Sequence, residues 1–121
     1  MASTRDARVV EVVSPACFRG DAALARAFEL LGKRWNAVLL GILGGGSTGF
    51  RDLSRAIGRI SDSVLADRLA ELTHAGLITR TVDVGPPVSV SYALTDCGAA
   101  LMPALRQIAQ WAEEHLSADE G

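Results

Sequence analysis

The feature of this sequence that most restricts its fold is a change in hydrophobic period at Gly76. Before Gly76, apolar residues recur at intervals of three and four, as they do along one face of an α-helix. After it, residues 77–82 and 88–94 favour extended strands, and a Gly85-Pro86-Pro87 turn separates them. The helical spacing returns after Thr95. This order predicts a mostly α-helical fold with one small β-hairpin, followed by a last helix.

The first two helices are divided by a glycine. Asp21 is expected to cap a first helix, which Gly32 ends. A second helix follows at once, and its apolar stripe consists of Trp35, Val38, Leu39, Ile42 and Leu43. Because Trp35 falls in this stripe, core packing is a better interpretation for it than the wall of a ligand pocket.

Two further helices lie on either side of a tight turn at Gly58. The third spans residues 50–57, and either Ser61 or Asp62 caps a fourth that runs to about Ala75. The fourth helix is expected to face the core with Leu65, Leu69 and Leu72. Two short helices joined by a glycine-containing turn and followed by a hairpin form a winged helix-turn-helix. The fourth helix would then enter a DNA major groove, and the hairpin would be the wing.

The last helix is expected to begin after a Thr95 cap, and Pro103 should kink or delay it. Its apolar stripe is longer than a small core requires. Together with the first helix, it predicts additional N- and C-terminal dimerisation helices. The interface residues would be Leu24, Phe28, Leu101, Leu105, Ile108 and Trp111. The alternative is that the stripe packs only on its own domain.

Composition and charge fit one globular domain. Of the 121 residues, 49% are hydrophobic and 21% charged. We expect an N-terminal arm at residues 1–16, a domain at 17–116 and an acidic tail at 117–121. No apolar run is long enough to span a membrane, and the polar start lacks the apolar centre of a signal peptide, so we expect a cytoplasmic, nucleoid-associated protein. Two cysteines and two histidines at these spacings predict no metal site, no disulfide framework and no cofactor.

The formal net charge of −2 conceals an uneven distribution. Residues 1–60 carry nine Lys/Arg and five Asp/Glu, a balance of +4, whereas residues 61–121 carry three and nine, a balance of −6. This division is typical of a protein with one basic face and an acidic far end.

Several short motifs, taken in order, resemble the HxlR family of regulators. The resemblance covers about residues 17 to 111. The matching stretches are Leu31-Gly32-Lys33-Arg34-Trp35, Phe50-Arg51-Asp52-Leu53, Leu65-Ala66-Asp67-Arg68-Leu69-Ala70-Glu71-Leu72, Ala75-Gly76-Leu77-Ile78-Thr79-Arg80 and Tyr92-Ala93-Leu94-Thr95-Asp96-Cys97-Gly98. The family implies a dimeric transcription factor, and several of its members respond to electrophiles or oxidants. A homodimer would in turn require a palindromic site in double-stranded DNA.

The positions expected to face DNA come from the third and fourth helices and the hairpin. They are Arg51, Arg55, Arg59, Ser61, Ser63, Ala66, Asp67, Arg68 and Arg80. Arg68 could bind phosphate or brace its helix. Ser63 stands where relatives often carry a basic residue, and residues 84–88 at the hairpin tip contain no Lys or Arg. These departures keep open a solvated helix face as the alternative.

Cys17 precedes the expected first helix and lies beside Arg19. The resemblance implies that redox sensors of the family carry their sensing cysteine here. A helix N-terminus and a nearby cation both favour the thiolate. We therefore expect a response to an oxidant or a small electrophile through Cys17, with an inert packed cysteine as the alternative. Cys97 follows Asp96, which opposes thiolate formation, and is expected to pack.

Two other function classes compete with DNA-binding regulation. The near-neutral fourth helix and the bare hairpin tip would also suit a winged-helix protein-interaction module that does not bind DNA. The other class is an enzyme in which Cys17 acts together with a histidine. No Cys, His or Ser of the sequence stands in a catalytic signature, so we expect that the protein is not an enzyme.

Overall fold

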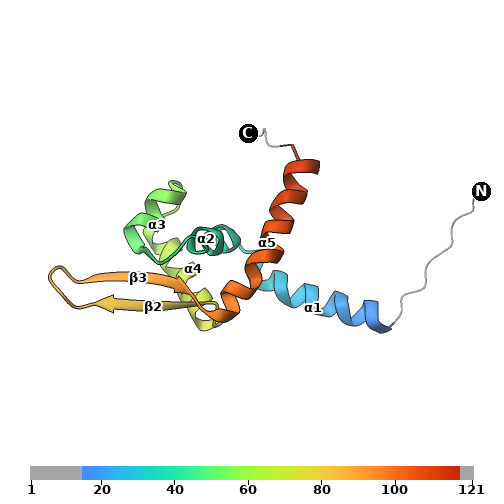
Figure 1. The fold of residues 1–121 in the computed structure, drawn as a ribbon, viewed down its shortest axis with the longest axis horizontal. Coiled ribbons are helices and arrows are strands. Elements are labelled where there is room, and N and C mark those ends of the chain that lie inside the picture. Colours follow the sequence, from blue (N-terminus) through green and yellow to red (C-terminus); the bar gives the residue numbers. More distant parts are fainter. Residues whose placement is uncertain (1–14, 118–121) are drawn as a thin grey trace, which may run out of the picture. The chain divides into compact units, whose positions relative to one another are not determined.

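The computed structural model describes residues 15–117, with side chains from residue 22 onward. The chain divides into two units, residues 1–33 and 34–121, which are described separately. Its elements in order are α1 (Pro15–Leu31), α2 (Asn36–Leu43), β1 (Thr48–Gly49), α3 (Phe50–Ile57), α4 (Asp62–His74), β2 (Ile78–Asp83), β3 (Ser89–Leu94) and α5 (Asp96–His115). The second unit confirms the predicted winged helix-turn-helix, in which α3 and α4 are the two short helices and β2–β3 is the wing (Figure 1).

Helix α1 makes up the described part of the first unit. It begins at Pro15, so the expected cap at Asp21 is wrong. Proline suits the first helical position because its φ is already helical and the N–H that it lacks would have no partner there. The helix ends at Gly32 as predicted, and the Gly32 N–H donates to the Phe28 carbonyl at 3.0 Å. Leu24 and Phe28 are 58% and 46% exposed, which leaves an apolar face uncovered. The expected arm before Pro15 lies outside the described residues.

The core of the second unit is built mainly from leucines of α2, α3 and α4. Its fully buried apolar side chains are Leu39, Leu40, Leu53, Leu65, Leu69, Leu72 and Ile78. The leucine stripe predicted for α4 is therefore confirmed. Burial of one such side chain contributes roughly 1.5–3 kcal/mol relative to exposure. These leucines fix the orientation of α4 in its unit and turn its opposite face outward.

The sheet has three antiparallel strands in the order β1-β3-β2, one strand more than predicted. The additional strand comprises only Thr48–Gly49, which is too short to display an alternating pattern in the sequence. The other two strands form the predicted hairpin. Its register pairs Ile78 with Leu94 at the base and Asp83 with Ser89 near the tip.

The start of α5 packs closely against the segment that joins α4 to β2. Thr95 caps α5 as predicted: its Oγ1 accepts from the Gly98 N–H at 3.1 Å and donates to the Gly76 carbonyl at 2.7 Å. A Cβ on Gly98 would lie 2.2 Å from the Leu77 carbonyl oxygen, so only glycine fits. Helix α5 starts directly after this cap, without the delay expected from Pro103. It is the longest helix between residues 15 and 117, a region in which no helix is both long and apolar enough to cross a bilayer.

Several side chains depart from the predicted core. Trp35 lies before α2 rather than within it, has a left-handed φ of 81° and is only half-buried. Val38 is 50% exposed although it belongs to the predicted stripe of α2. In α5 the buried apolar side chain is Met102, while Leu101 and Leu105 are half-buried. The hydrophobic period thus identified these helices, but packing selects a core face slightly rotated from the predicted one.

Candidate nucleic-acid interface

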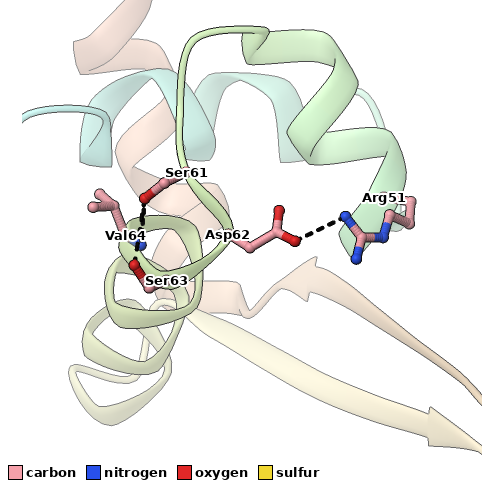
Figure 2. Close-up of polar contacts among 5 residues, drawn as sticks. All are labelled: Arg51, Ser61, Asp62, Ser63 and Val64. Atoms are coloured by element: carbon pink, nitrogen blue, oxygen red, sulfur yellow. Dashed lines mark hydrogen bonds and ion pairs between the residues drawn. The ribbon is translucent and has the colours of Figure 1, made fainter.

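The turn between α3 and α4 is set by a glycine and a serine cap. Gly58 follows α3 with φ 81°, a conformation that costs glycine little. Ser61 then caps α4, because its Oγ accepts a hydrogen bond from the Val64 N–H at 3.2 Å. The Ser63 Oγ lies 3.4 Å from the Ser61 Oγ, so two hydroxyls stand together at the start of α4 (Figure 2).

The side of α4 opposite its buried leucines is open to solvent. The exposed residues on it include Ser63, Ala66, Asp67 and Ala70, and Ser61 is exposed at the cap directly before the helix. All five side chains are small, so a helix with this surface could bring its backbone close to a neighbouring molecule. The major groove of B-DNA is about 12 Å wide and admits one α-helix. The exposure of this face satisfies the steric requirement for such an insertion.

A groove of about 1040 Å³ lies between the hairpin and the two helices of the turn motif. It is continuous with the outer face of α4, since Ala66 and Ala70 belong to both. Three guanidinium groups line it beside one carboxylate. The charged residues of the lining, apart from histidine, are Arg51, Asp52, Arg55 and Arg80. This excess of positive charge suits a polyanion.

Two of these arginines form ion pairs at the surface. The Arg51 Nη1 lies 3.0 Å from the Asp62 Oδ2 (Figure 2), and Arg55 pairs with Asp52. The four side chains are between 53% and 71% exposed. Exposed pairs of this kind contribute at most about 1 kcal/mol. A phosphate could therefore replace either carboxylate at little energetic cost.

Arg68 has a different environment. Its Nη1 lies 3.0 Å from the Glu71 Oε1, and the two side chains are only 24% and 26% exposed. The same carboxylate oxygen accepts a hydrogen bond from the Asn36 Nδ2 at 3.4 Å, which connects α4 to α2. Of the two roles expected for Arg68, this geometry favours bracing the helix over binding phosphate.

The remaining expected cations, Arg59 and Arg80, are exposed and form no ion pair with any residue between 22 and 117. Arg80 lies on β2 and lines the groove. The tip of the hairpin is apolar, with Val84 and Val88 exposed to 82% and 67%. The positive charge of the hairpin therefore lies along its length, at Arg80, and not at its tip.

The apolar stripe of α5 becomes exposed toward its C-terminal end. Ile108 and Trp111 are 45% and 52% exposed. The Trp111 ring stacks on that of His115, with 5.9 Å between the ring centroids. The rest of the described chain therefore covers only about half of each of these two side chains.

The cysteines differ from expectation in two ways. Cys17 lies in the first turn of α1 and not before the helix, because α1 begins at Pro15. Its side chain is outside the described ones. Cys97 is an exposed free thiol in the first turn of α5, whereas the sequence predicted that it packs. Gly98 and Met102 are the buried positions of this helix, and Cys97 falls beside that face.

Two exposed residues, His74 and Arg34, were not among the positions predicted to face DNA. His74, at the end of α4, lines the groove together with Arg80. Arg34 places its Cζ 4.6 Å from the centroid of the Trp35 ring. The adjacent basic and aromatic residues in Lys33-Arg34-Trp35 could have indicated the contact between Arg34 and Trp35 from the sequence.

Comparison with known proteins agrees with this architecture. Residues 30–120 match the HxlR-like helix-turn-helix family. The HTH-type transcriptional regulator YodB of Bacillus subtilis (strain 168) is 39% identical over 88 residues, which are 73% of this chain and 79% of YodB. The structure of the reduced form of YodB superposes with a TM-score of 0.69 and 32% identity, covering 90% of this chain and all of YodB.

Two further structures are similar. Quinone-bound YodB has a TM-score of 0.67 and 35% identity, covering 76% of this chain and 96% of that one. The redox regulator HypR in its oxidised form has a TM-score of 0.74 and 26% identity, covering 79% of this chain and 99% of HypR. Since the family match spans most of the sequence, this chain belongs to the HxlR-like helix-turn-helix family of transcriptional regulators, which bind DNA and are not enzymes.

Proposed function

We propose that this protein binds a palindromic double-stranded DNA operator as a homodimer and thereby controls transcription in the cytoplasm, at the nucleoid. The observation that carries the proposal is the open outer face of α4, which continues into an arginine-lined groove. In this proposal Ser61 and Ser63 donate to phosphates or base edges, beside Ala66 and Asp67. The phosphate-binding cations are Arg51, Arg55, Arg59 and Arg80. The functional domain is residues 17–116.

Binding to DNA fragments from the promoter regions beside the gene tests this proposal. Fluorescence anisotropy at low salt should give one fragment with a Kd far below that of random duplex, and the affinity should fall steeply with salt. Replacing both groove arginines (Arg51→Gln with Arg55→Gln) should weaken binding to all duplexes, while Arg106→Gln on α5 serves as the matched control. Absence of binding to every promoter fragment would refute the proposal.

The dimer rests on the uncovered apolar faces of α5 and α1. The proposed interface residues are Leu24, Phe28, Leu101, Leu105, Ile108 and Trp111, of which four are at least 45% exposed. A twofold axis would set the two α4 helices about 34–36 Å apart and require half-sites about one DNA turn apart. Trp111→Glu should yield a monomer by sedimentation velocity with unchanged circular dichroism. A variant that stays dimeric would exclude this face.

The effector is proposed to act on Cys17. The similarity to YodB, which has been solved in a quinone-bound form, and to the redox regulator HypR supports this. The thiolate adds to a ring carbon of the quinone, so a carbon–sulfur bond forms as the ring C=C π bond breaks and its electron pair moves to a carbonyl oxygen. That oxygen takes up from solvent the proton that the thiol had released. The ring C–H proton then moves to the second oxygen, which gives a hydroquinone thioether. Placement of Cys17 in the first turn of α1 favours the thiolate.

Treatment with a quinone or with diamide, before measurement of operator binding, tests Cys17. The treatment should change the affinity of the wild type for the operator and leave the affinity of Cys17→Ser unchanged. Cys97→Ser should respond like the wild type. If Cys97→Ser alone abolishes the response, the exposed thiol on α5 is the sensor instead.

The second candidate is a protein-interaction module without DNA binding. The apolar hairpin tip at Val84 and Val88 and the carboxylate of Asp67 on the outer face of α4 favour it. The two functions separate in the anisotropy experiment, because only a DNA-binding protein shows a salt-dependent preference for one duplex.

A further inference from the structure

A second group of cations lies outside the groove. The Arg34 Cζ is 4.6 Å and the Arg59 Cζ 5.8 Å from the centroid of the Trp35 indole ring. Arg34 comes from the start of the second unit and Arg59 from the turn between α3 and α4, so Trp35 gathers charges that are 25 positions apart in the sequence. We call these three residues the Trp35 cluster.

The cluster differs from the two groove arginines of α3 in how its charge is balanced. Arg51 and Arg55 are ion-paired with carboxylates, whereas the third groove arginine, Arg80, has no ion pair within residues 22–117. Within residues 22–117, neither Arg34 nor Arg59 has an ion pair, and both are exposed. A cation–π contact contributes about 0.5–1 kcal/mol at exposed sites and leaves the guanidinium N–H groups available for an anion.

The cluster and the groove lie on different flanks of α4. Ala66 and Ala70 line the groove. Glu71 follows Ala70 by one residue, a rotation of about 100° around the helix, and reaches toward α2, where the Asn36 Nδ2 donates to it at 3.4 Å. Asn36 directly follows Trp35 in the chain, and Arg59 lies two residues before the Ser61 cap of α4. The contact with Glu71 therefore places the start of α2, and with it the Trp35 cluster, on the flank of α4 away from the groove.

We propose that the Trp35 cluster binds the phosphate backbone on the edge of the major groove opposite to the strand held by Arg51, Arg55 and Arg80. A helix inserted in a major groove has one phosphate strand on each side, and cations on both flanks of α4 match that arrangement. In this proposal Trp35 is a positioning residue that holds the two guanidinium groups. The inference rests on the proposed DNA binding and adds the contact to the second strand.

The salt dependence of operator binding tests the inference. The slope of log K against log salt falls by roughly 0.9 for each phosphate that the protein no longer neutralises. The double variant Arg34→Gln with Arg59→Gln should therefore reduce the slope by about 1.8, equivalent to about twelvefold less loss of affinity than the wild type shows between 50 and 200 mM salt. Arg106→Gln is the control and should keep the full slope.

DNA with uncharged phosphate positions shows where the Trp35 cluster contacts the operator. Methylphosphonate substitution of the phosphates on one strand at the edge of the half-site should weaken the wild type and leave the double variant unaffected. If the double variant keeps the wild-type slope and the same methylphosphonate sensitivity, the inference is wrong although DNA binding stands. If the wild type itself binds no operator, the proposed function fails first. If the double variant does not fold, Arg34→Gln alone, which changes only one exposed side chain, replaces it in the experiment. Its slope should fall by roughly 0.9.

Discussion

Helices α4 and α5 begin in the same way and end up with opposite surfaces. Each starts after a hydroxyl cap, Ser61 in one case and Thr95 in the other. Helix α4 buries its leucines in its own unit and exposes small residues, whereas α5 exposes Ile108 and Trp111. A helical period thus says that one face is apolar, but not whether the same chain or another molecule covers it.

The largest expected difference between the helices concerns stability. Leu69→Ala removes a side chain that is 1% exposed and should lower the free energy of unfolding by about 2–5 kcal/mol. Ile108→Ala at 45% exposure should cost less than about 1 kcal/mol in a monomeric background such as Trp111→Glu. Urea denaturation of both variants measures this. Equal losses of stability would mean that α5 is covered within its own chain, which would remove the contrast.

The caps provide a second, smaller contrast. The Thr95 Oγ1 accepts from Gly98 and also donates to the Gly76 carbonyl, while the Ser61 Oγ accepts from Val64 at the surface. Thr95→Ala removes both bonds and should destabilise by about 2 kcal/mol, whereas Ser61→Ala should cost about 0.5–1 kcal/mol. Thermal unfolding of the two alanine variants compares them directly. A larger effect at Ser61 would contradict the greater structural role assigned to the α5 cap.

Local chemistry explains which parts could be predicted from the sequence. The bounds of α3, the Thr95 cap and the buried leucines of α4 were predicted correctly, because a cap or a stripe depends on residues within one or two turns. Strand β1 was missed because two residues carry no period. The start of α1 was misplaced because Asp21 looked like a cap, while Pro15 already fits a first helical position.

The candidate interface shows the same division. The outward positions of Ser63 and Asp67 followed from the helical spacing alone. The Arg51–Asp62 pair joins residues 11 positions apart, and the contact between Arg59 and Trp35 joins residues 24 apart. Both depend on the angle at which α3 crosses its neighbours, which the sequence pattern does not specify. Which arginines of this surface are paired, and with which residues, could therefore be learned only from the fold.

Asp67 gives the smallest expected effect and the sharpest test of how α4 reads DNA. It is exposed on the outer face, and no residue between 22 and 117 is ion-paired with it. Its charge opposes phosphates, so Asp67→Asn should tighten binding to random duplex by about two- to fivefold, an electrostatic effect that salt should screen. If Asp67 also accepts from a cytosine amino group, the same variant should bind the operator less selectively. Anisotropy with operator and random duplex separates these outcomes. An equal gain of affinity for both duplexes would mean that Asp67 only repels DNA. A smaller ratio of operator affinity to random-duplex affinity would mean that Asp67 contacts a base.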